Sequence, residues 1–493
     1  MTSKTLKNFG SIRNHALLFV ISCASLLVEG YHPGVEDDAV YLSAIQRRLH
    51  PALYPHDFHF FTLQMQASVF DRIMAAAVRL THIPVSVAEL LGQFLAAYFL
   101  LWGCWSIARR CFPAPAGQWA GVALVGVLFS MPVAGTALYI FDQYLHPRAI
   151  ATALILAAIV AVLESRITLA ATLLLASVVM HPIMGAFGVS FCAILLVAER
   201  WRLPSPARPA IIAGFATPLW IFEGPTPAWR QALSTRSYYF LSQWTWYELL
   251  GAIAPILILW LIAHYAKHQR RPVMSRLAIV AAIFAVFQFV IAAIIMLVPS
   301  LVRVLPMQPM RYLHLVYIFM ALLGGGILGE KLLRAHSIRW IIVFLPLATC
   351  MFVAQRALFR GTPHLELPGI SSRNPWLKAF AWAHTNTPND AYFALDPYYM
   401  ELPAEDYHSF RALAQRSQLA DAVKDPAVAS QVPELAPLWQ QQTQAAAGWR
   451  NFTAQDFQRL HQQFGVDWIV VHGSGAPGRV CPYRNEAVAV CRL

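Results

Sequence analysis

The chain has 493 residues, of which 58% are hydrophobic and 13% charged, and its mean hydropathy is +0.50. Soluble globular proteins carry about 25% charged residues, so cytosolic enzymes, DNA-binding proteins and disulfide-rich secreted modules are excluded. The apolar residues form blocks of about 14 to 23 residues, close to the length with which a helix crosses a bilayer. The sequence therefore predicts a polytopic membrane protein.

Eleven apolar blocks are candidates for membrane spans. In chain order we expect them near residues 12–28, 84–107, 118–139, 149–163, 167–180, 183–198, 209–222, 248–265, 277–298, 312–329 and 338–355. Residues 167–198 could also form one long kinked span. Because His181-Pro182 interrupts this run and proline breaks helices, we favour two short spans.

The net charge of +12 and the isoelectric point of about 9.5 could point to a nucleic-acid partner. However, the excess of basic residues lies in alternate gaps between the blocks, beginning with the N-terminal segment, which is the positive-inside pattern. We therefore expect no nucleic acid, a cytoplasmic N-terminus on an uncleaved anchor, and an external segment after residue 355. In a bacterium this places the chain in the inner membrane and its tail in the periplasm.

We expect two units, a transmembrane domain over residues 1–355 and a small external α/β domain over residues 356–493. In the tail, Asn374-Pro375 opens a helix over 376–384, and the capping-box pattern of Thr453 and Asp456 opens one over 457–464. Strands are expected at 391–395, 467–471 and 487–491. Cys481 and Cys491 both lie in this tail, and an oxidising compartment favours a disulfide between them.

The first external loop, residues 29–83, contains two amphipathic stretches. The first begins at Asp38 and repeats Tyr41, Leu42, Ile45 and Leu49 at helical spacing, and the second runs from Thr62 to His82. We expect both to form helices along the membrane surface. Packing against neighbouring spans is the alternative.

Three consecutive carboxylates, Glu36, Asp37 and Asp38, stand in this loop a few residues beyond the first span. Crowded like charges raise the pKa of at least one member, which suits a general base or a metal ligand. The alternative is that they complement the dipole of the helix that begins at Asp38. One acid would be enough for that role.

Histidines gather at the same predicted membrane face. His32, His50, His146 and His181 each precede a proline, and His56-Asp57 lies among aromatic residues. Histidine and carboxylate ligands suit a divalent ion, whereas an aromatic belt with polar tips would need none. No cofactor is expected beyond a possible divalent metal ion, for which the candidate ligands are Asp37, Asp38 and His56.

Cationic residues are predicted to reach this face from later loops. Arg148 follows Asp142 and His146 at the mouth of the fourth span, and Arg303 and Arg311 flank a proline-containing turn. Arginine binds phosphate bidentately, although such side chains can also merely extend towards lipid headgroups. The candidate substrate-binding residues are His32, His56, Asp57, Asp142, His146, Arg148, His181, Arg303 and Arg311.

The loop motif Glu36-Asp37-Asp38, the helices from Asp38 and Thr62, and the polar tail together resemble the GT-C superfamily of membrane glycosyltransferases. The tail lacks the WWD-type motif of oligosaccharyltransferases. The resemblance implies a mostly helical transmembrane bundle with an extracytoplasmic α/β domain. It also implies that a sugar moves, with inversion, from a polyprenyl-phosphate carrier in the lipid membrane to an external acceptor.

In that chemistry a carboxylate takes the proton of the acceptor while cations stabilise the departing phosphate. The resemblance assigns Asp37 or Asp38 as the base, with Glu36 in support. The alternative function is a non-catalytic scaffold of envelope assembly or a transporter of lipid-linked glycans. Against a transporter, hardly any ionisable residue is expected at the centre of a span, and no inverted repeat stands out.

Overall fold

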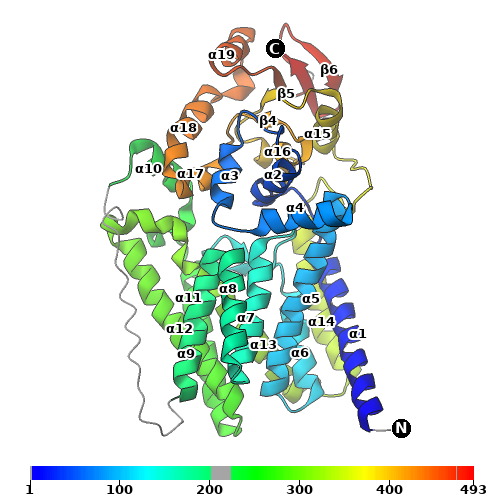
Figure 1. Cartoon of the computed structure of the whole chain (residues 1–493), viewed down its shortest axis with the longest axis vertical. Coiled ribbons are helices and arrows are strands. Elements are labelled where there is room, and N and C mark those ends of the chain that lie inside the picture. The colour runs from blue at the N-terminus through cyan, green and yellow to red at the C-terminus, as the bar shows by residue number, and fades with distance from the viewer. Residues whose placement is uncertain (1–2, 201–223, 474) are drawn as a thin grey trace.

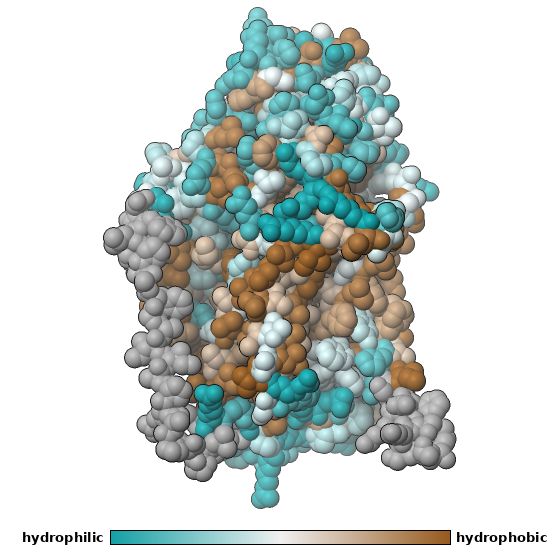
Figure 2. All heavy atoms as spheres, in the orientation of Figure 1, coloured by the Kyte–Doolittle hydropathy of each residue, from teal (hydrophilic) through white to brown (hydrophobic). Residues whose placement is uncertain are grey.

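The computed structural model describes residues 3–200, 224–473 and 475–493. Long helices form a bundle at one end of the molecule, and the C-terminal sheet lies at the other (Figure 1). Figure 2 shows a broad hydrophobic band across the visible face of the bundle, with hydrophilic surface above and below it. We call the end of the bundle that faces the sheet its tail-side end.

Within the described residues, seven helices are long and apolar enough to cross a membrane, and the chain is an integral membrane protein. They are α1 (Ser3–Glu29), α5 (Val85–Cys111), α9 (Pro182–Arg200), α11 (Trp246–His268), α12 (Pro272–Leu297), α13 (Leu313–Leu328, within an apolar segment Pro309–Leu333) and α14 (Ser337–Leu358). Three shorter helices accompany them: α6 (Pro115–Val127), α7 (Pro147–Leu163) and α8 (Ile167–Met180).

Ten of the eleven expected blocks thus coincide with helices, although three of these are short, and the block at 209–222 lies outside the described residues. The count of eleven spans is therefore not confirmed. Two short helices, α8 and α9, do replace one kinked span, because His181 adopts an extended backbone and Pro182 starts the next helix.

The block expected at 118–139 ends early, since α6 stops at Val127. The chain then folds into a small antiparallel hairpin of β1 (Pro132–Val133) and β2 (Leu138–Tyr139). Gly135 lies in its turn with φ +60°, and an added Cβ would meet the Trp244 ring at 2.3 Å, so only glycine fits there. The segment that follows the hairpin, residues 142–146, lies at the tail-side end of α7.

The first loop forms three helices, α2 (Asp38–Leu49), α3 (His59–Met65) and α4 (Phe70–Thr81). The helix expected over 62–82 is therefore wrong in extent. The chain breaks at Ser68, whose hydroxyl donates to the carbonyl of Met180 (2.7 Å) and accepts from the amide of Phe70 (3.1 Å). The α4 helix lies across the tail-side end of the bundle (Figure 1), and its Ile73 and Leu80 are exposed.

The α2 helix does not lie on the membrane surface as expected. Its residues from Asp38 to Gln46 are buried, and Gln46 donates from Nε2 to the carbonyl of Ala412 in the tail (2.9 Å). The apolar stripe of α2 is thus covered by protein, because the tail packs over it.

The tail contains a five-stranded sheet in the order β4-β3-β5-β7-β6. The strands are β3 (Tyr392–Ala394), β4 (Ser417–Gln418), β5 (Trp468–His472), β6 (Val480–Arg484) and β7 (Val488–Arg492), and β3 runs parallel to both β4 and β5. Its helices are α15 (Pro375–Asn386), α16 (Phe410–Ala414), α17 (Asp425–Gln431), α18 (Ala436–Ala445) and α19 (Ala454–Phe464).

Both helices and all three strands expected in the tail are present. Asn374 caps α15, and Thr453 and Asp456 form the capping box of α19. A disulfide joins Cys481 to Cys491 across β6 and β7. The sequence did not predict β4, β6 or the helices α16 to α18, and it is α16 and α17 that contact the first loop.

Several short helical elements lie between the bundle and the tail. They include α10 (Pro227–Ser234) and the 3-10 segments Ser237–Tyr239, Leu241–Gln243, Pro299–Met307 and Pro309–Tyr312. The first loop also pairs directly with the tail, since the amide of Ser409 donates to the carbonyl of Gly34 (2.8 Å) and that of Glu36 donates to the carbonyl of Tyr407 (3.1 Å). The segment that carries the three acids is therefore fixed by the tail.

Candidate functional site

A cavity of about 760 Å³ opens at the tail-side end of the bundle, where the first loop, the α8–α9 junction, the 3-10 turns and α17 meet. Its polar wall includes Asp37, His181, Arg303, Arg311 and Lys424. Its apolar wall includes Leu63, Met65, Met180, Ile183, Met307, Val428 and Val432. The cavity thus combines one acid of the loop motif with three cations and a hydrophobic surface.

Asp37 precedes α2 but its side chain does not cap that helix. It is 39% exposed, and its Oδ2 lies 3.8 Å from Nε2 of His146 while Oδ1 lies 3.6 Å from Nζ of Lys424. Burial raises the pKa of Asp37, but His146, Arg311 and Arg148 outweigh this and hold it below its ordinary value. At neutral pH the cavity therefore contains a carboxylate.

Asp38 and Glu36 have different surroundings. Asp38 is buried, accepts from the amide of Gly34 (2.6 Å) and does not line the cavity. Burial, with the charge of Asp37, raises the pKa of Asp38 to about 7. Glu36 forms an ion pair with Lys424. The raised pKa expected among the three acids is thus found at Asp38, which supports the loop. Asp37 is the acid that faces the cavity.

His146 stands beside Asp37 in a fixed orientation. Its Nδ1 accepts from the backbone amide of Arg148 (2.9 Å), so its proton is on Nε2, the atom that faces Asp37. Burial, together with the charge of Arg148, lowers the pKa of His146 to about 4, so the ring is neutral at pH 7. The Tyr41 ring packs edge-on against it, with centroids 4.7 Å apart.

Arg148 and Asp142 are brought close to Asp37 but pair with each other. Both carboxylate oxygens of Asp142 accept from the same guanidinium nitrogen of Arg148, at 2.5 and 2.6 Å, and both side chains are buried. Neither lines the cavity. Arg148 therefore acts on the cavity through its charge and does not offer itself as a direct ligand.

Arg303 and Arg311 do reach the cavity. The Arg303 guanidinium lies over the Trp229 ring, 5.5 Å from its centroid. Arg311 is buried, and its Nε has no hydrogen-bond partner within the part of the chain that the structure describes. A buried donor without a partner is costly, and an anionic ligand would satisfy it.

Lys424 lines the cavity, although the sequence offered no reason to assign it to the site. It comes from the tail, at the residue that precedes α17, and contacts both Glu36 and Asp37. Only its place beside Asp421 and Asp425 set it apart in the sequence, and nothing there indicated that it would meet a loop almost 390 residues earlier.

His32, His56 and Asp57 do not line the cavity. The Nδ1 atom of His32 lies 2.7 Å from Glu366, and His56 stacks on the Tyr392 ring with centroids 4.5 Å apart. Asp57 accepts from Nε of the buried Arg411 (2.6 Å). These residues hold the first loop against the tail, and the expectation that they gather at one substrate site is not met.

The candidate metal ligands do not come together either. Among the residues that the structure describes, no group of three or more His, Cys, Asp or Glu side chains is arranged to hold a metal ion. Asp37 faces the cavity, Asp38 accepts from Gly34, and His56 stacks on the sheet. The expected set of Asp37, Asp38 and His56 is therefore not assembled.

No protein-family model and no curated protein matches the chain. Among solved structures it is similar to the archaeal oligosaccharyltransferase AglB from Archaeoglobus fulgidus in complex with an inhibitory peptide and a dolichol-phosphate, with 11% sequence identity and a TM-score of 0.48. It is also similar to the apo form of the Archaeoglobus fulgidus oligosaccharyltransferase, with 11% identity and a TM-score of 0.40. Each match covers 93% of this chain and 69% of the other.

Proposed function

We propose that the chain is a membrane glycosyltransferase that moves a sugar from a polyprenyl-phosphate carrier to an acceptor outside the cytoplasm. The observation that carries the proposal is the cavity itself, in which the Asp37 carboxylate faces Arg303, Arg311 and Lys424. Acid and cations are the two groups that this transfer needs. A volume of about 760 Å³ suits a small ligand, and the apolar wall suits the first isoprene units of a carrier.

The reaction is a single displacement at the anomeric carbon. The acceptor oxygen attacks that carbon, the bond between the carbon and the phosphate oxygen breaks, and polyprenyl phosphate leaves. Asp37 takes the proton of the acceptor, while Arg303, Arg311 and Lys424 stabilise the negative charge on the leaving phosphate. His146 does not line the cavity and acts as a positioning residue, since its Nε2 lies 3.8 Å from Oδ2 of Asp37 and influences the orientation of this carboxylate electrostatically.

In this proposal the N-terminus lies in the cytoplasm, and residues 356–493 form an extracytoplasmic domain, which is periplasmic if the cell is bacterial. The basic residues at the other end of the bundle support this orientation, since Arg109, Arg110, Arg271 and Arg276 all lie there. The disulfide between Cys481 and Cys491 supports an oxidising compartment for the tail.

The proposal is tested with the full chain reconstituted in liposomes with polyprenyl-phosphate-linked sugars. The release of polyprenyl phosphate is measured together with sugar transfer to acceptors extracted from the cell envelope. We expect release that depends on the acceptor. Binding of the carrier without release would favour a scaffold, and movement of the intact carrier-linked glycan across the liposome membrane would favour a transporter.

The titration of Lys424 should set the basic limb of the pH profile of the transfer rate. Burial lowers the pKa of Lys424 to about 8, so its ammonium loses its proton as the pH rises through that value and the phosphate loses one stabilising cation. We expect the transfer rate to fall above about pH 8. In Lys424→Arg the guanidinium stays charged, so the limb should move to higher pH. An unchanged limb in this variant would remove Lys424 from the mechanism.

A further inference from the structure

A second cavity, of about 450 Å³, lies between α2, α3 and α4. Four of its ten lining residues are arginines, Arg47, Arg48, Arg72 and Arg79, and Asp71 is its one carboxylate. It shares no lining residue with the cavity that contains Asp37. Tyr41 of α2 lines one cavity and Ala44, about one helical turn further along, lines the other, so the two cavities are separate but follow each other along this helix.

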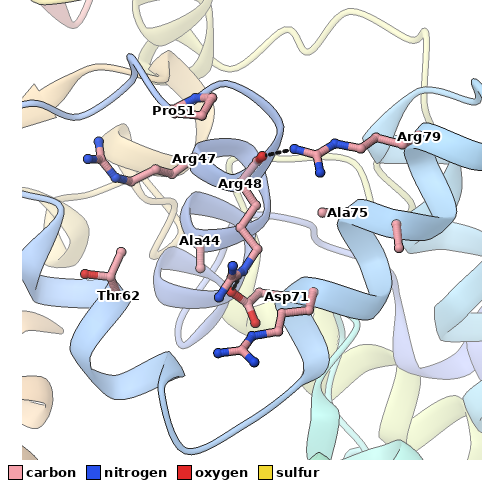
Figure 3. Close-up of a pocket in the computed structure, with 10 residues that line it drawn as sticks. Ala44, Arg47, Arg48, Pro51, Thr62, Asp71, Ala75 and Arg79 are labelled. Carbon is pink, nitrogen blue, oxygen red and sulfur yellow. Dashed lines mark hydrogen bonds and ion pairs between the residues drawn. The ribbon is translucent and has the colours of Figure 1, made fainter.

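Internal contacts hold three of the arginines in place, and Figure 3 shows Arg48 beside Asp71 and Arg79 at the carbonyl of Arg48. Arg48 pairs with the buried Asp71, Arg79 donates to the carbonyl of Arg48, and Arg47 donates to the carbonyl of Leu53 with its guanidinium 4.1 Å from the centroid of the Phe58 ring. These contacts use only part of the donors, because each guanidinium has five N–H groups. The arginines are therefore oriented with donors to spare.

Arg72 completes the cluster. It is exposed, and no hydrogen bond or ion pair joins it to any residue of the described ranges. Ala44, Ala75 and Ala76 supply small side chains to the wall, so the space between the guanidinium groups is open. Four cations around one carboxylate repel one another, and a bound anion would remove that repulsion.

The position of the cavity identifies the source of the anion. The α4 helix lies across the tail-side end of the bundle, and Figure 2 shows a strongly hydrophilic patch over α2 and α4 directly above the hydrophobic band. Ile73 and Leu80, which follow Arg72 and Arg79, are 49% and 81% exposed. An apolar surface therefore adjoins each of these arginines at headgroup depth.

We propose that this cavity binds the phosphate headgroup of an anionic phospholipid, whose acyl chains lie against Ile73 and Leu80. Arginine binds phosphate oxygens through paired N–H donors, and the apolar residues beside it restrict the ligand to one that is anchored in the bilayer. The site is separate from the proposed donor cavity, and its existence does not depend on glycosyl transfer.

The test uses the detergent-solubilised full chain and three probes, dioctanoyl phosphatidylglycerol, dioctanoyl phosphatidylcholine and inorganic phosphate. Binding is measured by native mass spectrometry and by the shift in melting temperature. We expect phosphatidylglycerol to bind and to raise the melting temperature, and the other two probes to do neither. An equal effect of phosphatidylcholine, or of inorganic phosphate alone, would overturn the proposal.

Arg72→Gln with Arg79→Gln should weaken phosphatidylglycerol binding about 30-fold, since each arginine near an anionic lipid contributes about 1 kcal/mol. Arg373→Gln with Arg492→Gln removes the same charge from exposed positions of the tail, which do not line this cavity. This double variant should leave binding unchanged. Without lipid, the melting temperature of both variants should equal that of the wild type. Equal loss of affinity in the two double variants would show that net charge alone attracts the lipid, and the site would be rejected.

Discussion

Asp37→Asn is expected to lower the rate of sugar transfer by about 10²–10⁴-fold, the usual contribution of a general base. Asparagine keeps the shape of the side chain but cannot take the proton of the acceptor. Asp37 is 39% exposed and does not cap α2, so the loss of its charge should leave the fold intact. The rate is measured as polyprenyl phosphate released by the full chain in liposomes.

Asp38→Asn distinguishes the two candidate bases. The raised pKa of Asp38, about 7, would suit a base, but this side chain is buried and accepts from the amide of Gly34. An amide oxygen can accept the same hydrogen bond, so Asp38→Asn should cost less than about tenfold in rate. Asp390→Asn changes an exposed carboxylate of the tail and serves as the matched control. If Asp38→Asn abolished transfer and Asp37→Asn did not, the assignment would pass to Asp38.

Arg411→Met is expected to have the largest effect on stability. The Arg411 guanidinium is buried and forms hydrogen bonds with Asp57 (2.6 Å) and with both carboxylate oxygens of Asp425 (3.1 Å each). Its removal leaves two buried carboxylates without their cation, which costs about 3–5 kcal/mol. Because Asp57 belongs to the first loop and Asp425 to the tail, the loss should separate these two parts.

The measurement is the melting temperature of the full chain in detergent, together with the rate at which a protease releases the tail. Arg459→Met is the matched control, since Arg459 and Asp456 form a solvent-accessible pair that water screens and that contributes little to stability. Equal protease sensitivity of the two variants would mean that the buried pair does not hold the loop against the tail.

The elements that depend on neighbouring residues could be predicted from the sequence. The proline at 182 separates α8 from α9, Asn374 caps α15, and Thr453 with Asp456 starts α19. Each of these signals acts within a few residues, so its outcome does not depend on the rest of the fold. The same holds for the start of α2 at Asp38, whose apolar spacing is local.

The arrangement of the site could be predicted only in part. The three acids and the two turn arginines stood out by residue type. Nothing near Lys424 indicated that it would contact Asp37, and the pairing of Arg148 with Asp142 could not be foreseen. The prediction that α2 lies on the membrane surface was wrong for the same reason, because an apolar stripe has the same spacing whether lipid or the tail covers it. These features depend on contacts between distant segments, which residue spacing does not encode.

The contact between the first loop and the tail also sets the order in which the site can be assembled. The carbonyl of Gly34 accepts from the amide of Ser409. Because these two residues lie far apart in the sequence, the first loop leaves the ribosome long before its partner in the tail is made. At about 5–20 residues per second, synthesis of the intervening chain takes on the order of 20–75 s. A nascent chain that has not yet reached Lys424 therefore lacks part of the cavity wall.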